Sequence, residues 1–489
     1  ISFSSIDSVL KENLRWIPYN KGGGTRKWYG YNNYLIDWKD NAQEIRNIKS
    51  AVITNEKYYM KPGLTWSTVS SKGFGIRYFK NGFIFDNGGC CLFNLGSRID
   101  YFAGLMNSKV FTTVMGEINP TLNFQSGEIS KFPVILKEVD PSISQKNYRI
   151  SKKDWDSRET SWDFKQSPLL NESTSLEKAY QNWEENVTQD FFQLHSNEEE
   201  LNRIFIAIYG LQDELTPEVA LKDITILQDE LNGKDLEALE PKFRAEGAAN
   251  ISLPIDKAAV MQQFVSYAIG LFMGRYRLDK PGLIIAHPNP TKEELASYNY
   301  NNGHVTIDED AIVPLMGTAA NFKDDALYQI QELLDTIWGK DTRTENLNFL
   351  QDGLNKDLEK YLVKDFWKYH CKTYKKKPIY WLFSSKKGAF QVLVYMHRMN
   401  AFTVEKIRAN YLLEHLKNLN AEITALEKDK ANLNTQEARK LDQLRKDLLE
   451  CEEYDMHLKN AADAQITFDL DDGVTENYKL FEDVVAKIK

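Results

Sequence analysis

The leucines between residues 403 and 458 constrain the fold of this chain more than any other feature. Apolar residues recur there at alternating spacings of four and three, at Leu412, Leu416, Leu419, Ile423, Leu426 and Leu433, with Lys430 in one core slot. That spacing is typical of a coiled coil. A polar break at 432–435 precedes a second seam of Ala438, Leu441, Leu444, Leu448 and Cys451. Two helices with a polar turn between them predict an antiparallel hairpin, and one long helix that dimerises is the alternative.

The first 135 residues show a different pattern, with short segments of strand character. Thr65-Trp-Ser-Thr-Val-Ser70 alternates, 75–85 places Asn81-Gly82 between two β-type runs, and 90–95 is another apolar run. Asn-Gly between such runs predicts a β-hairpin. Ser97 is a suitable cap for a helix through 114.

Helical signals dominate the rest of the chain. Thr174 with Glu177 and Ser196 with Glu199 form two capping boxes, the second of which predicts a helix ending at Gly210. Residues 225–255 predict loops, and helices are expected at 257–274, 323–338 and 344–369. The runs 379–384 and 389–395 predict a hairpin that turns at 386–388.

Together these patterns predict an α+β fold. We expect a mixed α/β domain at 1–140, a polar connector at 141–173 and a mainly helical domain with a small β-hairpin at 174–400. A coiled-coil hairpin at 401–460 and a tail with a short helix at 461–489 complete the prediction. The length of 489 residues suits a chain of several domains.

Charge is distributed unevenly along the chain. Residues 1–135 hold 16 basic and 10 acidic residues, a net charge of +6, whereas the whole chain carries -9 and the remainder therefore -15. A basic first domain on an acidic body suits a protein whose first domain contacts nucleic acid, although an ordinary solvated surface can carry such a charge. No apolar run is long enough to span a membrane. The four cysteines have no CxxC spacing, which favours buried thiols in a reducing cytoplasm.

Motifs for catalysis are missing from the sequence. Phe85-Asp-Asn-Gly-Gly89 is only superficially similar to a cofactor-binding glycine turn, because no strand–helix unit surrounds it. Asn119-Pro-Thr and Asn289-Pro-Thr lack the second proline and the aromatic residue of an adenine methyltransferase pocket. The four cysteines and seven histidines show no metal-ligand spacing. We therefore expect no catalytic or metal-binding residues in this chain.

Two segments of the first domain carry residues suited to DNA. The run 18–30 combines Lys21, three consecutive glycines, Arg26, Lys27 and Trp28. Glycines permit close approach to phosphates, which the cations neutralise, and an arginine can read guanine. The segment 119–125 adds short amides and a hydroxyl. A basic surface loop with its aromatic residues in the core, and a plain turn, are the alternatives for these two segments.

The helix at 101–109 followed by Asn119-Pro-Thr-Leu-Asn-Phe-Gln-Ser-Gly-Glu-Ile-Ser-Lys-Phe-Pro-Val-Ile135 resembles the closing segment of a DNA target-recognition domain. Longer strings resemble the PglX family, the adenine-specific DNA methyltransferases of BREX phage-defence systems. They include Trp16-Ile-Pro-Tyr-Asn-Lys-Gly-Gly, Phe74-Gly-Ile-Arg-Tyr78, Trp155-Asp-Ser-Arg-Glu-Thr-Ser-Trp-Asp-Phe164, Tyr209-Gly-Leu-Gln-Asp-Glu-Leu-Thr-Pro-Glu218 and Ile379-Tyr-Trp-Leu-Phe-Ser-Ser385.

The resemblance implies that this chain is the C-terminal, DNA-reading part of a longer enzyme that takes its methyl group from S-adenosylmethionine. The chain alone is expected to bind no cofactor and to be inactive, with double-stranded DNA and other BREX proteins as partners. The rival hypothesis is a scaffold whose helical body and coiled coil bind other defence proteins. The residues expected to bind DNA are Lys21, Gly22, Gly23, Arg26, Lys27, Trp28, Thr65, Trp66, Arg77, Asn119, Thr121, Asn123, Gln125, Lys375, Lys376, Lys377, Lys386 and Lys387.

Overall fold

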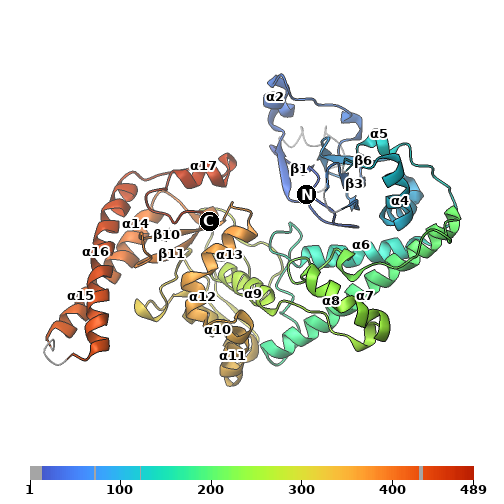
Figure 1. Cartoon of the computed structure of the whole chain (residues 1–489). Helices are drawn as coiled ribbons and strands as arrows, with labels where there is room; N and C mark the ends of the chain where they lie inside the picture. The colour runs from blue at the N-terminus through green and yellow to red at the C-terminus, as the bar shows by residue number, and fades with distance from the viewer. Residues whose placement is uncertain (1–13, 71–72, 122, 429–432, 489) are drawn as a thin grey trace. The chain divides into compact units, whose positions relative to one another are not determined.

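The computed structural model describes residues 14–70, 73–121, 123–428 and 433–488, and these form two compact units (Figure 1). Unit 1 comprises Ile1–Phe164 and Trp183–Asp256, and unit 2 comprises Lys165–Asn182 and Lys257–Lys489. These units differ from the predicted domains, because 183–256 cluster with the N-terminal region and not with the later helices. The α+β class is confirmed, since many helices accompany a few small sheets.

The described residues of unit 1 form two three-stranded sheets. One has the order β2-β1-β5, with β1 (Trp16–Asn20) antiparallel to β2 (Tyr34–Asp37) and parallel to β5 (Ile84–Phe85). The other has the order β4-β3-β6, with β3 (Gly63–Ser67) antiparallel to both β4 (Ile76–Phe79) and β6 (Gly89–Leu92). The predicted hairpin at Asn81-Gly82 is therefore wrong, because β4 and β5 belong to different sheets.

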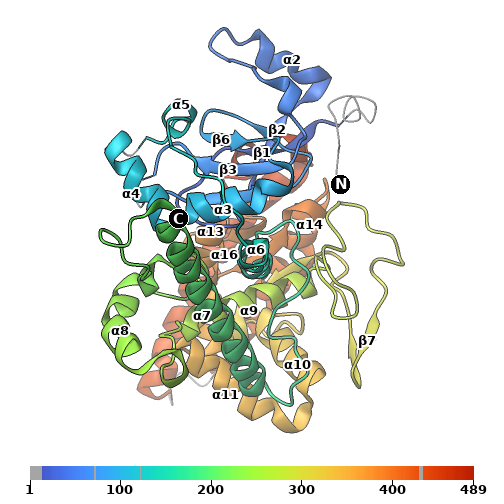
Figure 2. The same cartoon turned by 90° about the vertical axis from the view of Figure 1, so that its right-hand side faces the viewer.

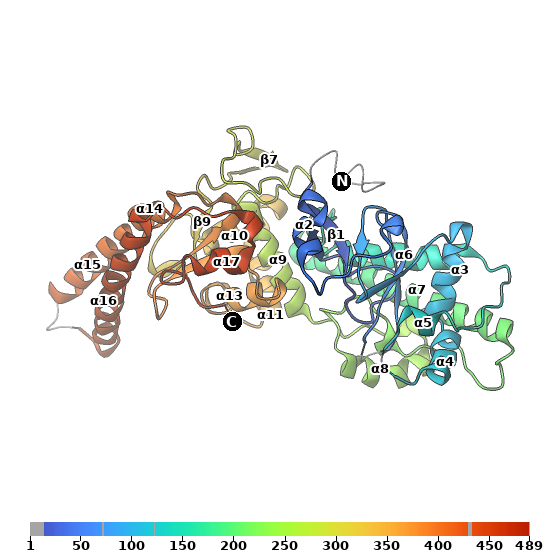
Figure 3. The ribbon, with the colours of Figure 1, turned by 90° about the horizontal axis from the view of Figure 1, so that it is seen from above.

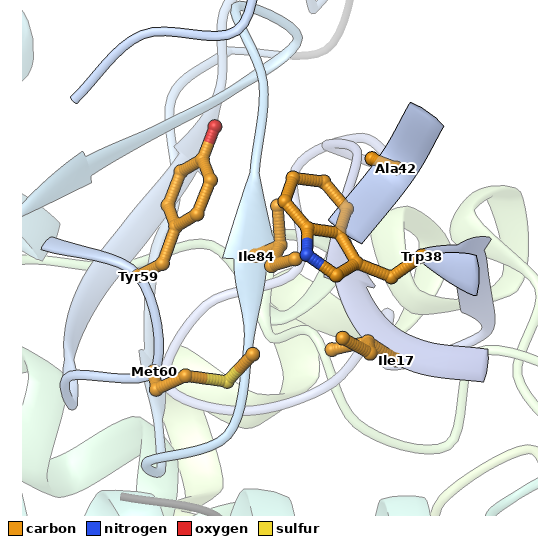
Figure 4. Close-up of a cluster of buried hydrophobic side chains, with 6 residues drawn as sticks. All are labelled: Ile17, Trp38, Ala42, Tyr59, Met60 and Ile84. Carbon is orange, nitrogen blue, oxygen red and sulfur yellow. The ribbon is translucent and has the colours of Figure 1, made fainter. Parts of the chain in front are cut away.

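A small core explains why the chain changes sheets at that turn. The amide of Met60 donates to Phe83 O over 2.9 Å, and the amide of Gly82 donates to Met60 O over 3.0 Å, which pulls β5 toward this core. The core gathers around the indole of Trp38, which is 2% exposed (Figure 4). Its buried members are Ile17, Trp38, Ala42, Tyr59, Met60 and Ile84. Burial of these side chains outweighs the local preference for a hairpin.

The helices of unit 1 begin at recognisable caps. A break at Ser108 divides the predicted helix 97–114 into α3 (Ile99–Asn107) and α4 (Lys109–Ile118), because Ser108 caps α4. Figure 2 shows α3 between the strands and α6 (Pro141–Asp156). Asp140 caps α6 and Pro141 is its first residue, so the predicted connector at 141–173 is wrong over this helix. Other described helices of this unit are α2 (Lys39–Asn47), α5 (Ser126–Ile129) and α8 (Gly233–Glu246).

Two further predictions in this region are wrong. Helix α7 (Leu176–Tyr209) runs without interruption for 34 residues, so no new helix starts at Ser196. Residues 225–255, expected to be loops, contain α8, which Asn232 caps. The predicted end of α7 is confirmed, since Gly210 has a φ of +65°.

Unit 2 is built around α9 (Lys257–Phe272), whose second half is entirely buried. The predicted hairpin is confirmed: β10 (Tyr380–Ser384) pairs with β11 (Gln391–Tyr395), which also pairs with β9 (Ile312–Pro314). The expected helix 344–369 is three helices. The other elements of this unit are β7 (Tyr298–Tyr300), β8 (Gly303–Val305), α10 (Ala326–Trp338), α11 (Arg343–Leu354), α12 (Leu358–Lys364) and α13 (Phe366–Thr373).

The predicted coiled-coil segment is a pair of long helices. A short helix, α14 (Thr403–Lys406), continues through a π-helical turn (Ile407–Leu412) into α15 (Leu413–Lys428), and α16 (Thr435–Asp463) follows (Figure 3). The two long helices pack together, and the seam residues Leu419, Ile423, Leu441, Leu444 and Cys451 are buried. Lys430 and Asn432 lie outside the described residues. The coiled-coil hairpin itself stays a prediction. Helix α17 (Val474–Lys479) lies near the C-terminus.

Short 3₁₀ helices complete the two units. They are η1 (Glu56–Tyr58), η2 (Gly96–Arg98), η3 (Leu221–Asp223), η4 (Ala248–Asn250), η5 (Gly317–Ala319), η6 (Lys340–Thr342), η7 (Met396–Arg398) and η9 (Leu470–Asp472). Among the described residues no helix is long and apolar enough to cross a membrane.

Candidate nucleic-acid interface

The glycine loop, residues 21–25, leaves β1 and is held by one hydroxyl group. Ser67 Oγ accepts from the amides of Gly23 and Gly24 over 2.8 and 3.0 Å and donates to Gly24 O over 2.9 Å. Gly22 has a φ of +78°, and a Cβ there would lie 2.2 Å from Gly88 O. The loop therefore requires glycine for its own packing, and two of its amides are already paired. The predicted contact of Gly22 and Gly23 with a DNA backbone stays a prediction, because the packing of the loop already explains these glycines.

Lys21 is the cation that this loop leaves exposed. Its Nζ lies 5.5 Å from the ring centre of Tyr34, and it forms no ion pair with another described residue. Tyr34 and Leu35, on the edge strand β2, are 38% and 49% exposed. An unpaired ammonium group beside an exposed ring is suited to a phosphate with a base or sugar nearby. Sequence reasoning missed this exposed edge, because it predicted no strand at Tyr34–Asp37.

The polar loop, residues 119–125, lies at the C-terminal end of β3. Asn123 pairs with Val69 in an isolated antiparallel β-bridge, and the amide of Phe124 donates to Thr68 O over 2.6 Å. The indole of Trp66 donates to Phe124 O over 2.7 Å. These contacts fix the backbone of the loop to the same strand end that holds the glycine loop. The structure thus brings together two segments that the sequence separates by about a hundred residues.

Side chains of the polar loop are ordered by one another. Asn119 Oδ1 accepts from the hydroxyl of Thr121 over 2.7 Å, and its amide donates to Asn123 O over 2.7 Å. Gln125 Nε2 donates to Asn123 Oδ1 over 3.2 Å. This leaves the amide donor of Asn123 and the amide carbonyl of Gln125 without a partner among the described residues. A neighbouring donor and acceptor match the pattern that adenine presents in the major groove. Leu122 lies outside the described residues.

Arg26 does not face solvent in this structure. It is 3% exposed, and its guanidinium donates to Tyr29 O over 2.6 Å, Thr225 O over 2.9 Å and Ser151 O over 2.9 Å. It also pairs with Asp154 over 2.7 Å. Burial opposes ionisation of Asp154, but the guanidinium groups of Arg158 and Arg26 outweigh it and hold its pKa below the ordinary value. The geometry therefore makes Arg26 a structural residue.

Lys27 and Trp28 are bound to one carboxylate of α7. Lys27 Nζ lies 2.6 Å from Glu198 Oε2, and the indole of Trp28 donates to Glu198 Oε1 over 2.8 Å. Trp28 is fully buried and Glu198 is 3% exposed. Both predicted DNA contacts are thus occupied within unit 1. Their role is to attach the segment after the glycine loop to α7.

The predicted strand residues are also internal. Thr65 is buried, and its hydroxyl donates to Cys90 O over 3.0 Å. Trp66 supports the polar loop as described above. Arg77 is 2% exposed and donates to Arg26 O over 3.2 Å, and burial lowers its pKa to about 10. In this structure Thr65 donates to strand β6, whereas Trp66 and Arg77 donate to backbone carbonyls of the polar loop and of the segment after the glycine loop. Every residue of β3 is buried, so alternation could not identify an exposed face.

The lysines predicted in unit 2 form two groups and not one clamp. Lys375, Lys376 and Lys377 precede β10, whereas Lys386 and Lys387 lie in the turn after it, and all five are exposed. The five residues of β10 separate the groups by roughly 17 Å at about 3.3 Å per residue. The turn is fixed by Glu450, which accepts from the amide of Lys387 over 2.6 Å.

The glycines at 88–89 do not fit a methyl donor. Asp86 Oδ1 accepts from the amides of Gly88 and Gly89 over 2.8 and 3.0 Å, and the loop leads from one short strand, β5, directly into another, β6, and not into a helix. A Cβ on Gly89 would lie 2.4 Å from Asn20 O, so this turn packs against its own chain. No cluster of metal-binding side chains occurs among the described residues.

Comparison with known proteins identifies the relatives of this chain. No family model matches it. It is 34% identical over 513 residues to the adenine-specific methyltransferase BrxX of Escherichia coli O9:H4 (strain HS), and the match covers 100% of the chain and 41% of that protein. It is 33% identical over 509 residues to the adenine-specific methyltransferase PglX of Lacticaseibacillus casei (strain Zhang), covering 98% of the chain and 40% of that protein. The chain is therefore homologous, over its whole length, to a segment that spans about two fifths of BrxX and PglX.

Proposed function

We propose that this chain is the DNA-recognition part of a longer, S-adenosylmethionine-dependent adenine-specific DNA methyltransferase of a BREX phage-defence system. Unit 1 reads a double-stranded site, and a catalytic part outside this chain transfers the methyl group. The complete enzyme works in the cytoplasm, where it marks host DNA and distinguishes it from phage DNA. This chain alone is inactive.

One observation carries the proposal: the polar loop and the glycine loop are fixed to the same end of β3. Lys21 supplies an unpaired cation there, and Asn123 and Gln125 supply an unpaired donor and acceptor. A phosphate contact positions a protein on DNA, whereas base contacts provide specificity. The homology to adenine-specific methyltransferases supports a duplex as the ligand.

The experiment measures binding of this chain to the duplex that the full-length enzyme methylates. That site is first identified by mapping adenine methylation in cells with and without the gene. Fluorescence anisotropy then compares the site with duplexes changed at single positions. Asn123→Ala should relax discrimination at one position by about 1–3 kcal/mol, because the amide donor that pairs with adenine N7 is lost. Lys21→Ala should weaken binding to all duplexes and reduce the salt slope by about 1.

Matched controls separate recognition from general damage. Thr113→Ala alters an exposed residue of α4, and Lys137→Ala removes an exposed cation outside both loops. Neither should change discrimination or the salt slope. Equal affinity of the unaltered chain for all duplexes, or discrimination that survives Asn123→Ala with Gln125→Ala, contradicts the proposal.

A second candidate function is an interaction scaffold within the defence system. Leu449 and Met456 favour it, because they lie seven residues apart on α16 and are 59% and 61% exposed. Two exposed apolar side chains on one helix face suit contact with another protein. Leu449→Lys with Met456→Lys should abolish co-purification with other defence proteins while leaving duplex binding intact. Loss of duplex binding in that variant would argue that the two functions share a surface.

A further inference from the structure

An open aromatic hollow lies at the opposite end of β6 from the glycine loop. It has a volume of 260 Å³ and is lined by Asn55, Tyr58, Phe85, Cys91, Phe93 and Asn94. These residues come from η1, from β5 and from β6 with the turn after it. We call this group the aromatic hollow. None of its residues was among the predicted DNA contacts.

The rings of the hollow form a partly exposed stacking surface. Tyr58 and Phe93 lie parallel, with ring centres 5.1 Å apart and an interplanar angle of 13°. Phe85 lies 5.1 Å from Phe93 and tilted by 46°. All three rings are only half-buried. Half-buried aromatic rings offer faces and edges to a planar ligand.

Two unpaired cations flank these rings. Lys57 Nζ lies 5.1 Å and Lys61 Nζ 5.5 Å from the ring centre of Tyr58. Both lysines are exposed, and neither forms an ion pair with another described residue. Aromatic side chains beside unpaired lysines are the combination with which proteins bind single-stranded nucleic acid, because bases stack on the rings and phosphates pair with the ammonium groups.

Two amides complete the hollow. Asn55 and Asn94 have φ values of +61° and +59°, and neither side-chain amide has a hydrogen-bond partner among the described residues. The left-handed turn explains why asparagine is tolerated at each position, but it leaves both amides available to the edge of a base. Cys91 lines the hollow with a neutral thiol, because burial raises its pKa to about 12. The lining thus carries no negative charge that would repel a phosphate.

The hollow also has a fixed relation to the glycine loop. Gly89 pairs with Ser67 at one end of β6, and Leu92 pairs with Leu64 at the other, next to Phe93. The four residues of the strand span roughly 13 Å at about 3.3 Å per residue. That length matches about four steps of a nucleic-acid strand at 3.4 Å each. One strand could therefore contact Lys21 and reach the hollow.

We propose that the aromatic hollow binds one unstacked base of a DNA strand, with Lys57 and Lys61 on the adjacent phosphates. The inference rests on the proposed function, since it adds a base-holding site to the same DNA-binding unit. Stacking contributes the affinity, and the amides of Asn55 and Asn94 contact the base edge. The two lysines favour a strand over a free nucleotide, because a strand offers a phosphate on each side of the base.

A fluorescent base tests this proposal directly. A single-stranded oligonucleotide that contains 2-aminopurine is titrated with the full chain, and quenching reports stacking of that base. Tyr58→Ala should weaken binding of the oligonucleotide, measured by quenching, by about 5- to 150-fold, the range typical of loss of one base stack. Lys57→Ala with Lys61→Ala should weaken it and lower its salt dependence without removing a ring.

A control variant distinguishes loss of the proposed binding site from general damage to the fold. Lys49→Ala changes an exposed lysine that does not line the hollow and should have no effect. Unchanged quenching in both the Tyr58 variant and the double-lysine variant overturns the hollow as a site. Adenosine monophosphate that binds as tightly as the oligonucleotide overturns the choice of a strand.

The same variants distinguish this inference from the proposed function. Duplex discrimination that depends on Asn123 but no quenching at the hollow overturns only the hollow. Quenching that depends on Tyr58, together with duplex binding that ignores Asn123, overturns only the reading of bases by the polar loop. The double-lysine variant alters only exposed side chains, so it stays informative if Tyr58→Ala unfolds.

Discussion

Arg26→Ala should destabilise unit 1 strongly instead of relaxing DNA discrimination. The guanidinium is 3% exposed, pairs with Asp154 and donates to three backbone carbonyls. Removing one member of a buried ion pair typically costs about 3–5 kcal/mol, since the remaining charge stays buried. Typical domains are stable by only about 5–15 kcal/mol, so this loss is large. The melting temperature of unit 1 should fall by roughly 6–20 °C.

Hydrogen exchange measured by mass spectrometry locates the effect. Amides of α6, which carries Asp154, should exchange much faster in Arg26→Ala than in the unaltered chain. Amides of α9 in unit 2 should be unchanged. Arg26→Lys should be destabilised as well, because a single ammonium group cannot replace a planar fork that serves four acceptors.

Lys21→Ala is the matched control for this measurement. It removes an exposed cation from the same segment and should change stability by no more than about 0.5 kcal/mol. An Arg26→Ala chain with unaltered hydrogen exchange and relaxed discrimination at one base pair would refute the structural role. It would restore Arg26 as a base-reading residue.

Two further perturbations test the supports of each unit. Ser67→Ala should cost about 1–3 kcal/mol in urea unfolding, because the amides of Gly23 and Gly24 lose their acceptor. Unchanged stability there would contradict the role of Ser67 as the holder of the glycine loop. In unit 2, burial and then the nearby Arg275 lower the pKa of His397 to about 4. Its folded pKa is thus below the unfolded value of about 6.5, so stability is fully present above that value and falls as pH drops toward 4. Between pH 7 and pH 4, the free energy of unfolding of the His397→Gln chain should fall by about 3 kcal/mol less than that of the unaltered chain. An equal fall in both chains would contradict the lowered pKa of His397.

Local signals predicted the elements whose neighbours are close in sequence. The hairpin of β10 and β11 follows from two β-type runs and a turn at Gly388, whose φ is +84°. The end of α7 at Gly210 follows from its preference for a positive φ. In both cases the residues that decide the structure lie within a few positions of it.

Long-range packing decided the elements that sequence reasoning missed. Asn81-Gly82 lies at a bend, but Ile84 belongs to a core that includes Ile17 and Trp38, which no local pattern reveals. Helix α6 carried the signal Asp140-Pro141, which the polar character of the surrounding segment obscured.

The residues of the candidate interface also differ in whether the sequence alone reveals their surroundings. Residue type alone predicts DNA contacts at Asn123 and Gln125, and both side chains are exposed in the structure, where the contacts themselves stay a prediction. Arg26 and Trp28 have residue types that suit DNA, but their partners Asp154 and Glu198 lie more than a hundred residues further along the chain. Sequence spacing cannot distinguish an arginine that awaits a ligand from one with a distant carboxylate. Only the structure shows that Arg26 and Trp28 are paired with buried carboxylates.

Exchange of whole units between two full-length relatives with different methylation sites tests the central claim most directly. Residues of unit 1, 1–164 with 183–256, are replaced by those of the other relative, and adenine methylation is then mapped across the genome. The account predicts that the mark moves to the site of the donor protein. Exchange of 257–489 should leave the mark where it was. A mark that follows 257–489 while unit 1 is unchanged would contradict DNA recognition by unit 1.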